Sequence, residues 1–281
     1  MNTLTTIRTA NRVVGAVAPQ LAAEFARKLL MTPHARRPRD FELVALERAE
    51  RITFRFGVAG LRWGDSGPVV LMQHGWEGRP TQFAAFIEPL LAAGRQVIAI
   101  EAPAHGRSPG HESHVFAFAE TLLEVGAEIR GTESVLGHSM GGSAALYAIS
   151  QGLPASRAVT IGSPAALSRV LARFADWIAL PDEAKRCFVQ AVDRHVGVSA
   201  DALDVARLAN GLDVDALIVH DRDDREVPYD EARAWTTAWP AARLLSTQGL
   251  GHTRLLSDPT VVDTVVDFLT GAGHAQRSRA A

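Results

Sequence analysis

The stretch Gly137-His138-Ser139-Met140-Gly141 is the part of this chain that says most about its fold. It has the pattern G-x-S-x-G and lies between a short β-favouring run, 133–136, and a helix-favouring run, 143–149. A serine on a sharp turn between a strand and a helix is the arrangement of a nucleophile elbow. The flanking glycines leave room where strand and helix come close together. A five-residue pattern recurs by chance, so its meaning depends on the sequence around it.

Short apolar runs alternate with helix-like segments around this stretch. We predict strands at 69–73, 96–100, 135–136, 158–161, 216–219 and 243–245, after an opening hairpin at 52–58 and 61–63. We predict helices at 83–92, 115–129 and 261–269, and another directly after the elbow. Continuous apolar strands that alternate with helices indicate a doubly wound α/β fold, with a mostly parallel eight-stranded sheet covered on both faces.

Residues 164–210 interrupt this alternation with helix-like segments and no strong strand. Apolar residues fall on one helical face at positions 167, 170, 171, 174, 177 and 178. We expect a small helical cap over the carboxyl edge of the sheet, although core packing alone would produce the same stripe. The expected organisation is an N-terminal helix and linker (1–40), a core (41–163 and 211–271), a cap (164–210) and a flexible tail (272–281).

The N-terminal segment reads as one helix over residues 1–31, because apolar residues recur there at helical spacing. Residues 32–40 form a break rich in proline and arginine. We expect this helix to pack on the outside of the domain. The alternative, an amphipathic membrane anchor, is disfavoured because the polar face is not strongly basic.

The composition excludes several classes of function. The chain has 281 residues, 47% of them hydrophobic, and a net charge of −2, which gives no electrostatic case for nucleic acid or an anionic membrane. Cys187 is the only cysteine, so an intramolecular disulfide and a cysteine-based zinc site are ruled out. No run approaches the roughly 20 apolar residues that span a bilayer. We therefore expect a cytoplasmic protein without a membrane span. The oligomeric state is not indicated.

A serine becomes a good nucleophile only when a base takes its proton, and the base needs an acid to orient it. An acidic cluster, 221–226, directly follows the predicted strand that ends at His220, and His252 follows the last predicted strand. In doubly wound hydrolases the order along the chain is serine, acid, histidine. Because the carboxyl ends of parallel strands meet at one edge of the sheet, we expect Ser139, an acid of this cluster and His252 to lie there.

The chain resembles the α/β-hydrolase superfamily over about residues 50–270, in its serine-nucleophile, esterase-like branch. The matching motifs, in the family's order, are His74-Gly75-Trp76, Ala104-His105-Gly106-Arg107-Ser108, the elbow, Asp224-Arg225-Glu226-Val227-Pro228 and Gly251-His252. The resemblance implies that Ser139 is the nucleophile, His252 the base and Asp224 the acid, since the family's D-x-x-V-P pattern starts there. Asp221 and Asp223 are the competing acids. No cofactor is implied.

An oxyanion hole needs two N–H donors aimed at the developing negative charge. The amide of Met140, which follows the nucleophile, is one, and the resemblance points to the amide of Trp76 as the other. Trp76, His138, Phe174 and Trp177 are the expected residues of a substrate pocket. His74 and His105 are expected to pack and hydrogen-bond around the site, and His220 to be structural. Glu101 and Asp221 depart from the aspartate and the glycine common in relatives at these positions.

Rival sites have little support in the sequence. His105, His111 and His114 match no zinc spacing, no calcium loop follows Asp221, and no phosphate-binding loop occurs. We therefore expect no metal.

The expected function is hydrolysis of carboxylic esters of small to medium, partly apolar molecules through an acyl-enzyme, with water as co-substrate. A carbon–carbon bond hydrolase or a cofactor-free perhydrolase would use the same triad. A catalytically silent ligand-binding homologue is the alternative from another class, and a fluorophosphonate would not label it at Ser139.

Overall fold

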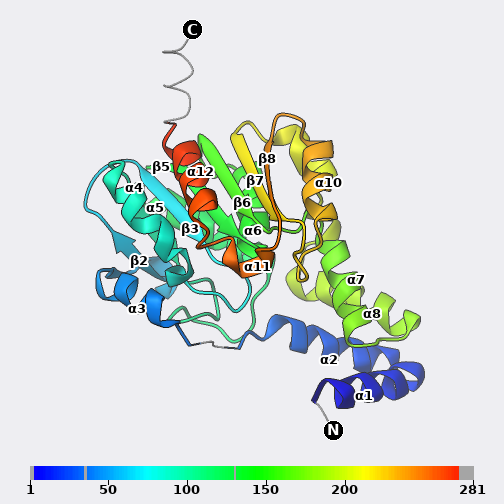
Figure 1. The fold of residues 1–281 in the computed structure, drawn as a ribbon. Coiled ribbons are helices and arrows are strands. Elements are labelled where there is room, and N and C mark those ends of the chain that lie inside the picture. Colours follow the sequence, from blue (N-terminus) through cyan, green and yellow to red (C-terminus); the bar gives the residue numbers. More distant parts are fainter. Residues whose placement is uncertain (1–2, 35–36, 130, 272–281) are drawn as a thin grey trace.

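The computed structural model describes residues 3–34, 37–129 and 131–271, and it shows an open, twisted sheet with helices on both faces (Figure 1). The predicted tail, 272–281, lies outside the described residues. The strands are β1 (Glu50–Thr53), β2 (Ala59–Trp63), β3 (Val69–Gln73), β4 (Gln96–Ile100), β5 (Thr132–His138), β6 (Arg157–Ile161), β7 (Asp215–Asp221) and β8 (Arg243–Thr247).

The strand order in the sheet is β1-β2-β4-β3-β5-β6-β7-β8. The β1–β2 and β2–β4 pairs are antiparallel, and every later pair is parallel. The prediction of a mostly parallel, eight-stranded sheet is therefore confirmed. The opening hairpin forms, but its first strand ends at Thr53, and a 3-10 turn, Arg55–Gly57, replaces the predicted continuation to 58.

The central strands read as continuous apolar runs because helices cover both of their faces. Val70 and Leu71, neighbours on β3, point to opposite faces and are both fully buried. One face is covered by α5 (Val115–Ile129), α6 (Met140–Ser150) and α10 (Asp230–Ala238). The other face is covered by α4 (Ala84–Ala92) and α12 (Pro259–Thr270). The predicted helices at 83–92, 115–129 and 261–269 are found, whereas α10 was not predicted.

The segment between β6 and β7 contains α7 (Leu167–Trp177), α8 (Asp182–Val196) and the short α9 (Val205–Leu208). We call residues 164–210 the cap. Glu231 at the start of α10 ties the cap to the core, because its buried carboxylate accepts hydrogen bonds from the Ala165 amide and the Arg169 guanidinium, and pairs with Arg173. Burial tends to raise the pKa of the Glu231 carboxyl, but these hydrogen bonds outweigh it and lower the pKa.

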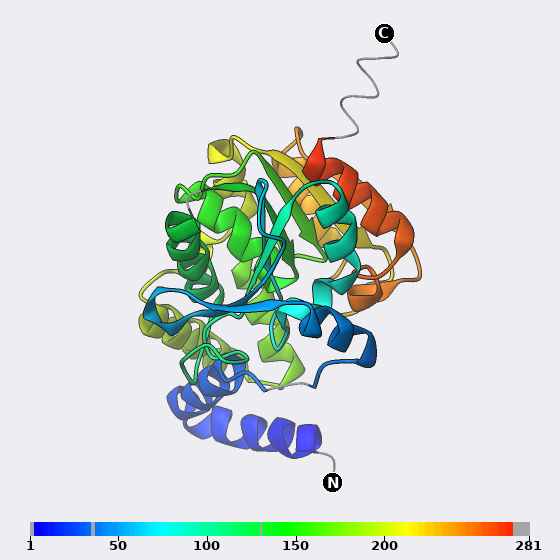
Figure 2. The ribbon, with the colours of Figure 1, turned by 90° about the vertical axis from the view of Figure 1, so that its left-hand side faces the viewer.

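The N-terminal segment forms two helices, α1 (Thr3–Val17) and α2 (Pro19–Met31), so the prediction of one helix over 1–31 is wrong. The chain turns at Ala18, where ψ is 69°, because the ring of Pro19 disfavours a helical conformation at the preceding residue. The two helices pack against cap helix α8 at one end of the molecule, as Figures 1 and 2 show from two sides. A further unpredicted helix, α3 (Asp40–Glu47), follows.

No helix within residues 3–34, 37–129 and 131–271 has both the length and the apolar character needed to cross a membrane.

Candidate active site

Ser139 lies on a strained turn between β5 and α6, with φ of 53° and ψ of −127°. Non-glycine residues rarely adopt positive φ, and such strain is typical of functional sites. Its own N–H donates to the carbonyl of Ile161 on β6 (2.8 Å), which fixes the turn against the sheet. A Cβ atom on Gly137 would overlap the backbone of Gly142, so the tight packing here requires glycine. The local sequence thus produces the predicted strand–turn–helix.

Two backbone amides stand free beside this turn. The Met140 N–H begins α6, and the Trp76 N–H lies in a tight turn closed by the Gly78 N–H and the Gly75 carbonyl (3.0 Å). Within the described residues neither amide has a hydrogen-bond acceptor. A Cβ atom on Gly75 would lie 2.8 Å from the Cβ of Ser139, so the loop after β3 runs directly beside the serine. Free amides in this position can stabilise negative charge on an oxygen.

His252 and Asp224 form a close pair. The Nδ1 atom of His252 lies 2.7 Å from Oδ2 of Asp224, and both side chains are buried. The other oxygen of Asp224 accepts the N–H groups of Glu226 (2.8 Å) and Val227 (2.9 Å). Burial tends to raise the pKa of the Asp224 carboxyl, but the hydrogen bond from His252 and the backbone donors outweigh it and lower the pKa. Among the described residues, Asp221 and Asp223 form hydrogen bonds elsewhere and neither pairs with the His252 ring.

The pair is held at the same corner as Ser139. A Cβ atom on Gly162 would lie 3.1 Å from Nδ1 of His252, and Gly162 directly follows Ile161, which accepts the Ser139 N–H. The ring of His138, the neighbour of Ser139, lies 4.7 Å from the ring of His252, and its Nε2–H donates to the His252 carbonyl (3.1 Å). The structure therefore brings the expected nucleophile, base and acid to one edge of the sheet.

Asp221 connects the loop that carries the acid to the loop that carries the histidine. One carboxylate oxygen accepts the Thr247 hydroxyl (2.6 Å) and the Leu250 N–H (3.0 Å), and the other accepts the Asp223 N–H (2.9 Å). Burial tends to raise its pKa, but these hydrogen bonds outweigh it and lower the pKa. The sequence marks Asp221 only as a competing acid and a departure from relatives. The bracing role was not predicted, because Thr247 and Leu250 lie 26 and 29 positions further along the chain.

An apolar cavity of about 420 Å³ opens next to Ser139. Trp76, Phe174 and Trp177, which the sequence suggested for a substrate pocket, line this cavity together with Met140. His138 does not line it, because its ring is buried against His252 instead. The aliphatic lining comes from the cap, from α5, from α2 and from the loop after β7, at positions 30, 31, 115, 167, 170, 171, 192, 196, 203 and 227. The contribution of the N-terminal helix to the wall was not expected from the sequence.

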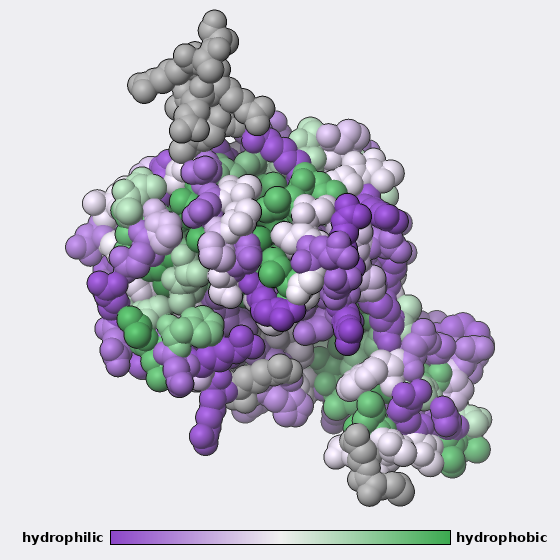
Figure 3. Space-filling view, viewed as in Figure 1, coloured by the Kyte–Doolittle hydropathy of each residue, from purple (hydrophilic) through white to green (hydrophobic). Residues whose placement is uncertain are grey.

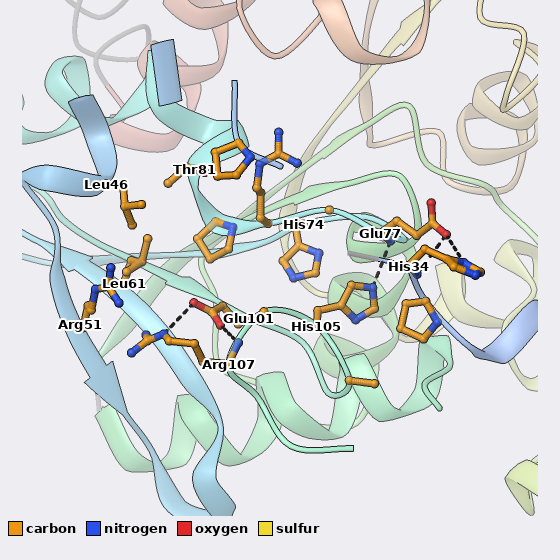
Figure 4. Close-up of a pocket in the computed structure, with 17 residues that line it drawn as sticks. His34, Leu46, Arg51, Leu61, His74, Glu77, Thr81, Glu101, His105 and Arg107 are labelled. Atoms are coloured by element: carbon orange, nitrogen blue, oxygen red, sulfur yellow. Dashed lines mark hydrogen bonds and ion pairs between the residues drawn. The ribbon is translucent and has the colours of Figure 1, made fainter. Parts of the chain in front are cut away.

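A second cavity, of about 350 Å³, lies beside the loop after β3, and Figure 4 shows how its side chains brace that loop. Nε2 of His105 accepts the Glu77 N–H (3.1 Å), and Nε2 of His74 accepts the Ala102 N–H (3.1 Å). Burial lowers the pKa of His74 to about 3, so this ring is neutral. The Glu101 carboxylate holds the next turn through the backbone and side-chain N–H groups of Arg107 (Figure 4). The polar groups around this cavity are hydrogen-bonded within the protein, and His74 and His105 pack and hydrogen-bond there as expected.

His220 at the end of β7 has a structural role, as expected. Its Nε2–H donates to the carbonyl of Val227 (2.9 Å) and so closes the loop that carries Asp224. In the part of the chain that the structure describes, no group of three His, Cys, Asp or Glu side chains is placed to hold a metal ion.

Two family models match the chain. A model described as the α/β-hydrolase fold matches residues 68–185, and a model described as TAP-like protein matches residues 189–279. The two matches meet within the cap and together include every residue of the candidate site from Trp76 to His252. No curated protein matches the chain.

Many solved structures share the fold at low identity. A candidate lipase from Acinetobacter baumannii is 17% identical, with a TM-score of 0.64 over 85% of this chain and 99% of the other. An esterase from Pyrococcus furiosus is 21% identical, with a TM-score of 0.60 over 85% and 97%. A bromoperoxidase from Bacillus anthracis is 17% identical, with a TM-score of 0.56 over 79% and 99%. Since these proteins differ in activity, the similarity identifies the fold only. The reaction has to be inferred from the residues of the site.

Proposed function

Because this chain belongs to the α/β-hydrolase superfamily, we propose that it is a serine hydrolase that cleaves carboxylic esters through an acyl-enzyme. The observation that carries the proposal is the buried His252–Asp224 pair, with 2.7 Å between Nδ1 and Oδ2, beside a serine held at positive φ. The Asp224 carboxylate accepts a hydrogen bond from the Nδ1–H group, and this leaves Nε2 of His252 as the basic atom of the ring.

The mechanism follows from these roles. The Ser139 hydroxyl attacks the ester carbonyl while His252 takes its proton, and the carbonyl oxygen becomes negative between the Met140 and Trp76 amides. The tetrahedral intermediate collapses, the C–O bond to the alcohol breaks, and His252 gives the proton to the departing alcohol. Water, deprotonated by His252, then attacks the acyl-enzyme, and as the C–O bond to Ser139 breaks His252 returns that proton to the serine oxygen, which releases the carboxylic acid and free Ser139. Asp224 orients the imidazole and stabilises its charged form throughout.

The cavity beside Ser139 supports an apolar acyl group of small to medium size. Its lining is mostly aliphatic and aromatic, and its volume of about 420 Å³ is in the range of small-molecule sites. Three charged residues also line the cavity: Arg173, which is paired with Glu231, and Arg225 and Glu226 from the loop after β7.

Initial rates on p-nitrophenyl esters from acetate to laurate test the proposal, with wild type measured beside Ser139→Ala. We expect turnover that disappears in the variant and an optimum at an intermediate chain length. A folded wild type that cleaves none of these esters would overturn the ester assignment. Activity on a vinylogous diketone or in perhydrolysis, with the same serine required, would then identify the reaction.

A further inference from the structure

The N-terminal helices expose large apolar side chains that the fold does not use. Val13 and Val17 on α1 are 62% and 80% exposed, and Leu21 and Phe25 on α2 are 66% and 50% exposed. The four are spaced four residues apart, so each pair lies on the outward side of its helix. We call α1 and α2 the N-terminal lobe. Figure 3 shows hydrophobic side chains on the surface at this end of the molecule.

The opposite side of the two helices already provides the packing that holds them. Ala22, Ala23 and Ala26 of α2 are buried in one cluster with Leu171 and Phe188 of the cap. Arg27 of α2 adds an ion pair with Glu112 (2.7 Å), on the loop before α5. The lobe is therefore attached by its inner face, and its outer apolar face has no partner among the described residues.

The N-terminal segment, residues 1–40, is also basic, although the net charge of the whole chain is −2. Residues 1–40 contain seven Arg and Lys against two Asp and Glu, whereas the other 241 residues contain 22 against 29. Within the described residues, Arg8, Arg12 and Lys28 form no ion pair, and Glu24, the one acid of α1 and α2, is paired with Arg27 (2.9 Å). A cationic surface that also carries exposed apolar residues is complementary to an anionic lipid surface.

We propose that the outer face of α1 and α2 docks this protein on the surface of an anionic phospholipid bilayer. Val13, Val17, Leu21 and Phe25 enter the boundary between headgroups and acyl chains, and the exposed Arg12 and Lys28 contact the lipid phosphates. The helices lie in the plane of the interface, because neither is long enough to span the bilayer. The sequence alone argued against a membrane anchor, because the polar face of the helix is not strongly basic. In the structure, α1 and α2 both contribute cationic side chains.

Docking by this face would bring the candidate active site close to lipid. Leu30 and Met31, at the end of α2, line the cavity that contains Ser139. A helix that contacts the bilayer on one side therefore forms a wall of the cavity with its last turn. The further idea that an ester in the bilayer reaches Ser139 past the end of α2 rests on the proposed function. Lipid binding by α1 and α2 does not rest on it.

Vesicle flotation with the full chain tests the proposal without requiring activity. Vesicles of phosphatidylcholine alone are compared with vesicles that also contain phosphatidylglycerol, at low and high salt. We expect flotation with the anionic vesicles and its loss at high salt, because salt screens exposed charges. The double variant Leu21→Ser/Phe25→Ser should lower partitioning about tenfold or more. Arg12→Glu/Lys28→Glu should lower it about fivefold or more for each cation removed.

Two variants serve as matched controls. Leu244→Ser changes a partly exposed apolar residue on the edge strand β8, and Arg207→Glu reverses an exposed cation on α9. Both should float like wild type. All variants should keep their thermal unfolding temperature and their rate on a water-soluble ester, since none of the changed residues lines the cavity.

The outcomes separate the two proposals. Failure of the wild type to float with anionic vesicles, or flotation that the α1–α2 variants leave unchanged, would overturn the lipid proposal whatever the ester assay gives. A wild type that is dimeric in solution, binds no vesicles and becomes monomeric in Leu21→Ser/Phe25→Ser would assign the face to a second copy instead. Flotation without ester hydrolysis would support lipid docking and count against the proposed function.

Discussion

His252 Nδ1 lies 2.7 Å from Asp224 Oδ2, in a corner where neither side chain is open to bulk solvent. A short, buried hydrogen bond of this kind fixes both the tautomer and the direction of the imidazole ring. Nε2 is then the ring atom that points away from Asp224, and it lies 3.8 Å from Oε2 of Glu226. This relationship makes the loops after β7 and β8 parts of one site.

Replacing Asp224 by Asn should abolish most turnover without unfolding the protein. Asn keeps an oxygen for the Glu226 and Val227 amides but offers no negative charge to His252. In the analogous serine protease case the loss in kcat is about 10⁴-fold. Steady-state rates on the best ester measure the effect. Asp223→Asn, an exposed change in the same loop, is the control and should retain full activity. Equal losses in the two variants would contradict the assigned role.

Replacing Asp221 by Asn should weaken both stability and turnover. The charged acceptor of the Thr247 hydroxyl and the Leu250 N–H is lost, and the amide presents one oxygen instead of two. We expect the free energy of unfolding to fall by about 1–3 kcal/mol. Urea unfolding measures this change, and kcat should fall because His252 follows Leu250 closely. Asp215→Asn, exposed at the start of the same strand, should change neither quantity.

Two buried histidines should make the protein less stable as the pH falls below neutrality. Burial lowers the pKa of both His74 and His138 to about 3, against 6.5 for a free histidine. Between these values the unfolded chain binds protons that the folded chain does not, so the free energy of unfolding must decrease as the pH falls from about 6.5 toward about 3. Each histidine contributes up to about 1.4 kcal/mol per pH unit.

Urea unfolding at a series of pH values measures that slope, and His138→Gln provides the comparison. Gln removes the titrating ring and keeps an N–H donor for the His252 carbonyl. The variant should therefore show a shallower dependence on pH than wild type. Identical slopes would mean that His138 is not held neutral in the folded state.

Replacing Phe174 by Ala should shift the preferred ester to a longer acyl chain. Phe174 lines the cavity beside Ser139 and packs against Trp177 and Phe188. The smaller side chain enlarges the cavity, so kcat/KM should rise for the longest esters and fall by about 10-fold for short ones, which lose apolar contact. The p-nitrophenyl ester series measures both changes. An unchanged profile would place the acyl group elsewhere.

The sequence predicts the sheet well because its signals are local. Val70 and Leu71 lie in an apolar run too short for a helix and bounded by turn residues, and burial on both faces follows from that. The elbow around Ser139 is recognisable from a local pattern, and Gly137 is required by the close backbone of Gly142, whereas Gly141 is required by the backbone of Gln73 and His74, far away in the sequence. Asp224 and His252 are singled out by the resemblance, and the structure places them in contact.

The remaining features depend on relations that no short pattern contains. The break at Ala18 is signalled by Pro19, but the helical spacing on either side of it conceals two separate helices. Leu30 and Met31 reach the cavity only because α2 packs on the cap. The bracing role of Asp221 requires the loop after β8 to lie beside the loop after β7.

Fluorophosphonate labelling followed by peptide mass spectrometry reports an activated serine whatever the true substrate. We predict stoichiometric labelling of wild type at Ser139, slow labelling of His252→Ala and none of Ser139→Ala. Absence of labelling in folded wild type, or a label on another serine, would contradict the claim that Ser139, His252 and Asp224 form a working nucleophilic site.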